Sequence, residues 1–228
     1  SASYTYGESS HTITASAASG GSGTYTYAKT SGNASITFNT STRVITVPAN
    51  LAVGSYPVVI KATDSITGAT ANATYTITIT PASINAPTGL TINTNGTVTW
   101  TASTGSGVTG YEISTDGGST WSSATSGVDV SEVLLASTGS KTVKVRAVST
   151  NSNYVSTSSE VSATATVVAV TISKSPAGGG SVSASSVNVI TGSTYSTSGS
   201  TLTMKGGTTT MYTITATASM CSMTKKNR

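Results

Sequence analysis

The most regular segment of the chain reads Lys141-Thr-Val-Lys-Val-Arg-Ala-Val148. Apolar residues alternate with polar ones along it, and this period of two is typical of a β-strand with one buried face. The alternation places Lys144 and Arg146 together on the polar face. The segment therefore predicts a strand of an antiparallel sheet that buries its valines and exposes its cations.

Further β-rich segments recur along the chain, separated by turns rich in Gly, Ser and Asn. They include His11-Thr-Ile-Thr14, Tyr25-Thr-Tyr27, Val44-Ile-Thr-Val47, Tyr56-Pro-Val-Val-Ile-Lys-Ala62 and Tyr75-Thr-Ile-Thr-Ile79. No segment repeats apolar residues at helical spacing over three turns. About two residues in five are Ser or Thr, which favours strands and turns over helices. We expect an all-β fold built from tandem antiparallel β-sandwiches.

Composition also limits the function classes. Only 8% of the 228 residues are charged and 36% are hydrophobic, which argues against a charge-expanded disordered chain. No apolar run reaches the roughly 18 residues of a membrane span, so we expect no membrane insertion. One His, one Cys and seven acids leave little material for a reactive centre. We therefore expect no enzyme activity, no catalytic residue, and no metal or other cofactor.

The net charge of +4 arises from 11 cations and 7 anions. Outside the tail the densest basic group is Lys141, Lys144 and Arg146; the tail itself holds Lys225, Lys226 and Arg228. Nucleic-acid binding needs a clustered basic surface, usually with stacking aromatics. We expect a solvated strand face instead, and no nucleic-acid partner.

The two ends of the chain offer few signals. It opens Ser1-Ala-Ser-Tyr-Thr-Tyr6, without a Met or an apolar signal core, so we interpret it as a piece of a longer protein. Cys221 is the single cysteine, so no internal disulfide can form. With no base near it in the sequence, Cys221 is expected to be an incidental free thiol.

Three modules are expected, over residues 1–81, 86–167 and 168–228. Pro81 and Pro87 bracket residues 82–86, and prolines favour extended linker geometry. A second boundary is expected near 167–171, where the strand pattern restarts before it breaks at Pro176-Ala-Gly-Gly-Gly180. The last module is the smallest, and we expect it to depend on its neighbour or on residues outside this chain.

The middle module carries five motifs in this order: Ala86-Pro-Thr-Gly-Leu90, Val98-Thr-Trp100, Gly110-Tyr-Glu-Ile-Ser114, Val133-Leu-Leu135 and Lys141–Val148. In this order of motifs the module resembles a fibronectin type III domain. The last two segments resemble the paired strands that close the sandwich. Lys141 stands where that family often has a tyrosine at the corner between its sheets. The resemblance implies that this corner is held in another way.

The clearest motif of the first module is Val53-Gly-Ser-Tyr-Pro-Val-Val-Ile-Lys-Ala-Thr-Asp64, followed by the tail strand Ala73-Thr-Tyr-Thr-Ile-Thr-Ile79. Through these segments the first module is similar to bacterial immunoglobulin-like and cadherin-like modules. The last module resembles repeat modules of bacterial surface proteins through Thr191-Gly-Ser-Thr-Tyr195 and Tyr212-Thr-Ile-Thr-Ala-Thr217. Strings of such modules imply a secreted or cell-surface protein that spaces, displays or adheres.

One local motif, Ser114-Thr-Asp-Gly-Gly-Ser-Thr-Trp121, fits the Asp-box pattern of sialidase-like propellers. Physically the motif is a hairpin turn, in which the acid accepts backbone N–H bonds and the glycines take positive φ. A sialidase-like site needs an arginine cluster, whereas this chain has only Arg43, Arg146 and Arg228. We interpret the motif as structural.

Candidate acids are few and scattered. Cadherin-like calcium sites need six or more oxygens, but Glu8 and Asp64 are the only acids of the first module. Glu112 and Asp116 are expected about 13 Å apart along one strand face, which is too far for paired acid–base chemistry. His11 lies in an alternating strand without an obvious partner, so we expect an exposed or edge histidine.

Two further groups remain open. An isopeptide bond is conceivable between Lys29 or Lys61 and Asn72, assisted by Glu8 or Asp64. The paired tyrosines Tyr4/Tyr6 and Tyr25/Tyr27 each share one strand face. We expect them to be core rings, and an exposed platform for sugar or protein is the alternative.

The expected function is a noncatalytic spacer or stalk outside the cell that also takes part in adhesion. Its partner would be an extracellular protein or a glycan, and no residue of the sequence identifies a binding site. Two alternatives stay open: an accessory carbohydrate-binding or spacer region of a secreted polysaccharide-degrading enzyme, and a structural decoration protein of a phage or surface filament.

Overall fold

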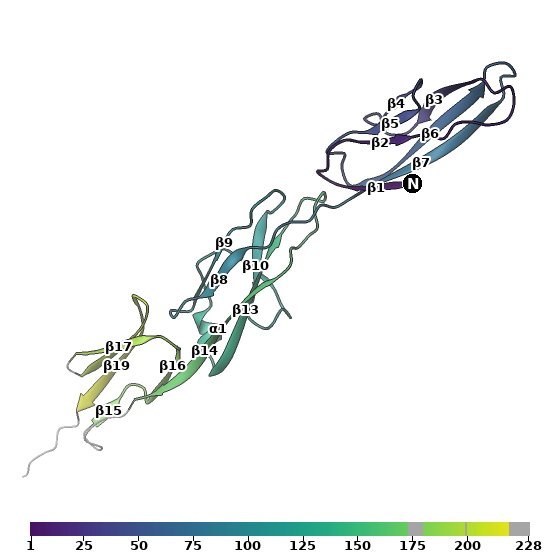
Figure 1. The fold of residues 1–228 in the computed structure, drawn as a ribbon. Coiled ribbons are helices and arrows are strands. Elements are labelled where there is room, and N and C mark those ends of the chain that lie inside the picture. Colours follow the sequence, from purple (N-terminus) through teal and green to yellow (C-terminus); the bar gives the residue numbers. More distant parts are fainter. Residues whose placement is uncertain (173–179, 199, 219–228) are drawn as a thin grey trace, which may run out of the picture. The chain divides into compact units, whose positions relative to one another are not determined.

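The computed structural model describes residues 1–172, 180–198 and 200–218. The described chain is all-β apart from one short helix, and nearly all its strand pairs are antiparallel (Figure 1). It divides into two compact units. Unit 1 holds Ser1–Ile84 and Ser149–Thr157, and unit 2 holds Asn85–Val148 and Ser158–Arg228.

Unit 1 contains two sheets. The first has the order β1-β7-β6-β3, with β1 at Ala2–Thr5, β7 at Thr70–Thr80, β6 at Gly54–Asp64 and β3 at Tyr25–Ser31. The second has the order β2-β5-β4, with β2 at His11–Thr14, β5 at Val44–Val47 and β4 at Thr37–Asn39. β1 pairs with β7 in parallel, whereas the other pairs of unit 1 are antiparallel.

Alternating residues of both sheets form one core in unit 1. Val58 and Ile60 of β6, Ile77 of β7, and Ile45 and Val47 of β5 are all buried in a single cluster. Fully burying a side chain of this size contributes about 1.5–3 kcal/mol, so this shared core holds the two sheets together.

The segment Ser149–Thr157 belongs to unit 1 although it follows a strand of unit 2. Ala82 forms a parallel bridge with Tyr154, and its N–H donates to the carbonyl of Asn153 at 3.0 Å. The side-chain oxygen of Asn153 accepts from the Val53 N–H at 3.0 Å, and the Tyr154 ring packs edge-on against Tyr6. Asn153 and Tyr154, which fall in the expected second module (86–167), therefore contact residues of the expected first module (1–81).

Unit 2 contains three sheets, with the orders β11-β10-β13-β14-β16, β12-β9-β8 and β15-β19-β18-β17. Their bounds are β8 Thr88–Ile92, β9 Thr97–Thr101, β10 Gly110–Ser114, β11 Ser122–Ala124, β12 Val128–Asp129, β13 Gly139–Val148, β14 Val161–Thr171, β15 Gly180–Val182, β16 Ser186–Ile190, β17 Thr194–Ser198, β18 Thr201–Gly206 and β19 Thr209–Ala218.

The segment 141–148 behaves as its alternation predicts. Val143, Val145 and Ala147 of β13 are fully buried. Val143 and Val145 share a core with Trp100 of β9 and Val167 of β14. At the position where the family resemblance places a tyrosine, the Lys141 ammonium donates to the Ser137 hydroxyl at 2.7 Å.

The expectation of a strand at Val133–Leu135 is wrong. These residues lie in the helix α1, Ser131–Leu135, which buries Leu134. The first turn is closed by a hydrogen bond from the Leu134 N–H to the Val130 carbonyl, and the Asp129 carboxylate accepts from the Ser131 N–H at 2.8 Å. Leu and Glu favour a helix, and a segment this short can form one turn without a sustained helical pattern.

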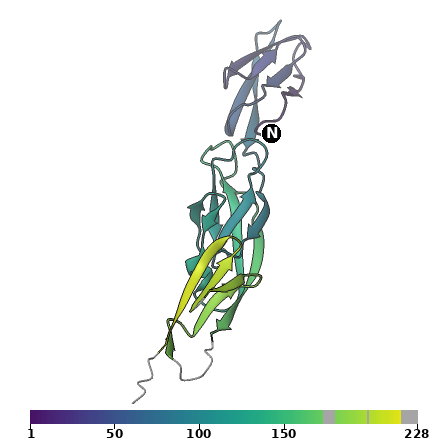
Figure 2. The same cartoon turned by 90° about the vertical axis from the view of Figure 1, so that its left-hand side faces the viewer.

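No break in secondary structure marks the boundary expected near 167–171, because β14 runs through it. Figures 1 and 2 both show β14, in green, continuing into the part of unit 2 that holds the yellow-green strands. There β14 pairs with β16. The expected break at 176–180 falls almost wholly on 173–179, which lie outside the described residues. None of the described helical residues belongs to a helix long and apolar enough to cross a membrane.

Candidate functional site

Asp116 organises the turn between β10 and β11. Its carboxylate accepts hydrogen bonds from the Thr120 hydroxyl at 2.6 Å, the Thr120 N–H at 3.0 Å and the Ser114 hydroxyl at 2.7 Å. These donors, with the Thr120 hydroxyl first, lower the pKa of Asp116. Gly117 and Gly118 both have positive φ. The Asp-box positions are thus engaged with one another in a hairpin turn.

The sheet face beside this turn carries paired charges. Arg146 of β13 lies 2.8 Å from the Glu112 carboxylate of β10, and its guanidinium lies 4.0 Å from the ring centre of Trp121. The ammonium of Lys144 lies 2.7 Å from Glu160. Lys144 and Arg146 share the polar face as predicted, but each has a carboxylate partner, so this face presents little free positive charge.

Glu112 and Asp116 are not brought together as a reactive pair. Glu112 pairs with Arg146, while Asp116 is occupied by Thr120 and Ser114. General acid–base chemistry needs a carboxyl group that can reach a substrate proton. Glu112 and Asp116 therefore both stabilise local structure and do not form an acid–base pair.

Asp64 performs a similar task in unit 1. It is buried at the end of β6, where its carboxylate accepts from the Ser22 hydroxyl at 2.6 Å and from the N–H groups of Ser22, Ile66 and Thr67. The Ser22 hydroxyl contributes most to a lowered pKa of Asp64. A side chain at Gly21 would meet this carboxylate, since an added Cβ would lie 2.4 Å from Oδ2.

The two acids considered for calcium have other partners. Asp64 is held by protein donors, and Glu8 lies 2.9 Å from the His11 ring nitrogen. In the described ranges, no three His, Cys, Asp or Glu side chains come together in a group that could hold a metal ion.

His11 has a partner that the sequence reasoning missed. The carboxylate of Glu8, three residues earlier, accepts a hydrogen bond from the His11 Nε2–H at 2.9 Å. The imidazole also stacks on Tyr4 of β1, with ring centres 3.9 Å apart and planes 7° apart. His11 lies on the edge strand β2, as expected. The expectation that it has no partner is wrong, because the chain reverses between β1 and β2 and brings these side chains together.

The groups considered for an isopeptide bond do not assemble. The Lys29 ammonium donates to the carbonyls of Asn33 and Ile36, each at 2.5 Å. Lys61 lies opposite Asn72 across β6 and β7, but Asn72 is exposed. A buried lysine, asparagine and acid in mutual contact are therefore not formed among these residues.

The tyrosines of unit 1 mostly pack against its core, as the core interpretation predicts. Tyr4, Tyr6 and Tyr27 are partly buried there, and Tyr75 joins them. The Tyr75 hydroxyl accepts from the Ser16 N–H at 2.8 Å, and the Tyr27 hydroxyl accepts from the Ala18 N–H at 2.9 Å. The two rings thus connect the sheet to the irregular segment at 15–18.

A small groove lies between that segment and the sheet, with a volume of about 130 Å³. Its lining is mainly alanine, supplied by Ala15, Ala17, Ala18, Ala62, Ala71 and Ala73, together with the rings of Tyr27 and Tyr75. The sequence reasoning missed this groove. Its signal was the alternation of Ala71 and Ala73 with polar residues before Tyr75, which places small side chains on the core face.

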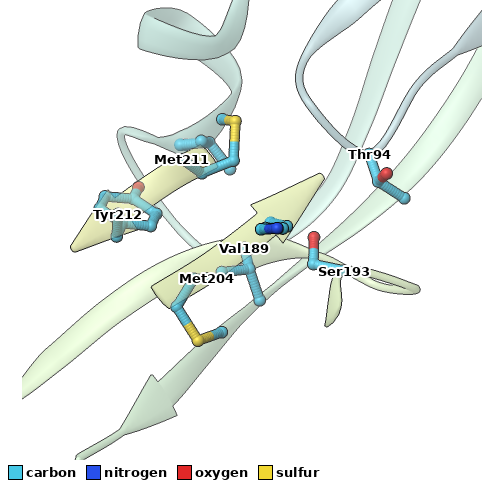
Figure 3. Close-up of a pocket in the computed structure, with 8 residues that line it drawn as sticks. Thr94, Val189, Ser193, Met204, Met211 and Tyr212 are labelled. Atoms are coloured by element: carbon cyan, nitrogen blue, oxygen red, sulfur yellow. The ribbon is translucent and has the colours of Figure 1, made fainter. Parts of the chain in front are cut away.

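A second cluster lies where β18 and β19 meet the β8–β9 turn within unit 2. Figure 3 shows Thr94 near Ser193, and the side chains of Met204, Met211 and Tyr212 around the same space. This space has no room for a water molecule. Gly206 lies directly on the turn, so the cluster is a packing contact and not a ligand site.

No family model matches the chain, and no curated protein matches it either. Cys221, Lys225, Lys226 and Arg228 lie outside the described residues.

Proposed function

We propose that the chain is a noncatalytic modular protein of the cell surface or extracellular space. It acts as a spacer that holds a partner away from a surface, and it contributes to adhesion. We also infer that unit 1 is an immunoglobulin-like or cadherin-like β-sandwich and that 86–167 is a fibronectin type III-like β-sandwich. The support is that, in both regions, strands of different sheets share one core.

The observation that carries the spacer proposal is the parallel pairing of β1 with β7. Ala2 lies opposite Ile77 and Thr5 lies opposite Thr80. Within Ser1–Ile84, the larger of the two segments of unit 1, the chain therefore enters and leaves in the same direction. A load applied at the two ends of this unit pulls the two strands past each other and strains their hydrogen bonds together, which suits a module that transmits force.

The state of the charged side chains supports the noncatalytic part of the proposal. Asp64 and Asp116 each accept several hydrogen bonds within their own turns, and Glu112 and Glu160 each pair with a cation. Such groups stabilise local structure and are poorly placed to exchange protons with a substrate.

One alternative function, that of a carbohydrate-binding region, is supported by one exposed aromatic residue. Tyr195 of the edge strand β17 is 72% exposed, and an exposed ring can stack on a sugar. A glycan array probed with the full chain and with Tyr195→Ala tests this function. Binding that Tyr195→Ala abolishes would favour the carbohydrate-binding region over the spacer.

Force spectroscopy on the full chain, held at Ser1 and Arg228, tests the spacer proposal. Unit 1 should resist the load and then unfold in one step, because its parallel strand pair must shear as a whole. Gradual extension of unit 1 at low force would contradict the proposal.

A further inference from the structure

The turn between β8 and β9 contains Asn95 followed directly by Gly96, a pair of residues with a specific reactivity. Because glycine has no Cβ, its backbone nitrogen can approach the asparagine side chain closely. This nitrogen attacks the asparagine Cγ and closes a succinimide ring, while the side-chain amide takes up the glycine proton and leaves as ammonia. Water then opens the ring and gives either aspartate or isoaspartate. The pair is therefore a chemical modification site wherever the backbone is free to move.

Hydrogen bonds restrain both reacting groups in the folded turn. The Gly96 N–H donates to the Asn93 carbonyl at 2.9 Å. The Asn95 Oδ1 accepts from the Thr97 N–H at 3.1 Å and from the Thr97 hydroxyl at 2.7 Å. The Asn95 Nδ2 donates to the Thr209 hydroxyl of β19 at 3.3 Å. Ring closure needs rotation of this side-chain amide, so it is blocked while these bonds persist.

Two neighbouring elements of unit 2 also pack on this turn. Gly206 of β18 lies so close that an added Cβ would overlap the Asn95 N and the Thr94 carbonyl. Ser131 of α1 lies against Gly96, where an added Cβ would overlap the Ser131 Cα and Cβ. The backbone of the turn is therefore fixed by β18 and by α1, and it cannot adjust to form the ring while both remain packed.

We propose that Asn95 is a gated deamidation site, which converts to aspartate or isoaspartate only after β18 and β19 separate from the β8–β9 turn. Parts of a native protein open locally at a lower free energy than global unfolding requires. This separation removes the Gly206 contact and the Thr209 hydrogen bond together and admits water, the one co-reactant. The inference goes beyond the spacer and adhesion proposals and depends on neither.

The isoaspartate product should prevent β18 from packing on the turn again. Isoaspartate adds a CH₂ group to the backbone between residues 95 and 96, where Gly206 leaves no room for an added atom. Aspartate keeps the backbone length, and its carboxylate can still accept from the Thr97 N–H and hydroxyl. Formation of isoaspartate therefore makes the separation of β18 and β19 from the turn irreversible, whereas formation of aspartate does not.

Peptide mass spectrometry on the full chain tests whether folding blocks the reaction. The chain is incubated at mildly alkaline pH, either folded or in concentrated urea, and conversion at Asn95 is compared with conversion at Asn72. Asn72 is exposed but is followed by Ala73, so it serves as the internal control. In urea Asn95 should react faster than Asn72, and folding should slow Asn95 by about tenfold or more. Equal rates at Asn95 in the folded chain and in urea would overturn the proposal.

Two variants test whether β18 and β19 are the elements that block the reaction. Gly206→Ala forces β18 away from the turn and should raise conversion at Asn95 about fivefold or more over its matched control, Gly110→Ala. Thr209→Val removes the acceptor of the Asn95 amide and provides a second test if Gly206→Ala fails to fold. It should react about twofold faster or more than Thr210→Val, which changes the exposed threonine beside it. Unchanged rates in both test variants would contradict the proposal.

A comparison of two purified forms tests the structural consequence. Chains that carry isoaspartate at position 95 should unfold in unit 2 at a lower urea concentration than Asn95→Asp, which has the new charge without the added CH₂ group. Tryptophan fluorescence is the readout, because Trp100 and Trp121 both lie in unit 2. Equal unfolding midpoints would contradict the claim that isoaspartate prevents repacking. The force measurement on unit 1 tests the spacer independently of all these results.

Discussion

The backbone N–H of Tyr6 donates to the carbonyl of Thr80 at 2.9 Å, immediately beyond the parallel pairing of β1 with β7. The Thr80 hydroxyl donates in turn to the Tyr4 carbonyl at 3.2 Å. Tyr4 also stacks on His11 of β2, so β1 is attached to both sheets of unit 1. This short strand is therefore a structural element of the unit.

Asn153 should stabilise unit 1 through its side chain. Asn153→Ala leaves the Val53 N–H without its acceptor and should lower the free energy of unfolding by about 1 kcal/mol. Asn153→Asp retains an acceptor oxygen and is the matched control. Amide exchange at Val53 should accelerate in Asn153→Ala alone, and equal exchange in both variants would contradict the assigned hydrogen bond.

Asp64 should make the stability of unit 1 depend on acid pH. Its donors lower the pKa of the folded state below the ordinary value of 3.8. The ionised group therefore contributes stability at pH values above 3.8, and this contribution declines as the pH falls through that value towards the folded pKa.

Asp64→Asn is predicted to melt at a lower temperature than wild type at pH 7. The difference between the two melting temperatures should narrow below about pH 4, because the wild type then loses the stabilising carboxylate charge that the variant already lacks. Calorimetry across this range is the measurement. Ser22→Ala removes the hydroxyl that contributes most to the lowered pKa of Asp64, so its melting temperature should show the same pH dependence with a smaller difference from wild type. A gap that is constant with pH would refute the role of the charge.

Gly206 should be intolerant of a side chain because of the close approach of β18 to the β8–β9 turn. A Cβ at Gly206 would lie 2.4 Å from the Asn95 N and from the Thr94 C and O atoms. Gly206→Ala should therefore destabilise unit 2 by about 1–3 kcal/mol. Gly110→Ala, whose Cβ would meet only ordinary contacts, is the control.

Trp fluorescence during urea unfolding reports this difference, since both tryptophans of the chain, Trp100 and Trp121, lie in unit 2. Equal midpoints for Gly206→Ala and Gly110→Ala would show that β18 does not rest on the turn in solution.

Local patterns predicted much of the fold. The alternation at 141–148 identified the buried residues of β13. A strand with one buried face alternates apolar and polar residues, so neighbouring positions alone are enough to recognise it. The Asp116 turn could also be predicted from the sequence, because its donors and acceptors lie within a few residues of one another.

Features that depend on distant contacts were not predictable in this way. The contact of Asn153 with Val53 joins positions 100 residues apart, and no local pattern indicates it. The single turn of α1 is too short to establish a helical period, so its apolar residues were interpreted as a strand.

The most direct test of the spacer is the force needed to unfold unit 1 in the full chain when β1 cannot pair fully. Tyr4 has the same strand phase as Tyr6, so Tyr4→Pro removes an N–H directed at β7, whereas Tyr4→Ala keeps it and controls for the lost ring. The account predicts a clearly lower unfolding force for Tyr4→Pro than for Tyr4→Ala. Equal forces for the two variants would contradict the claim that the parallel pair of β1 and β7 bears the load.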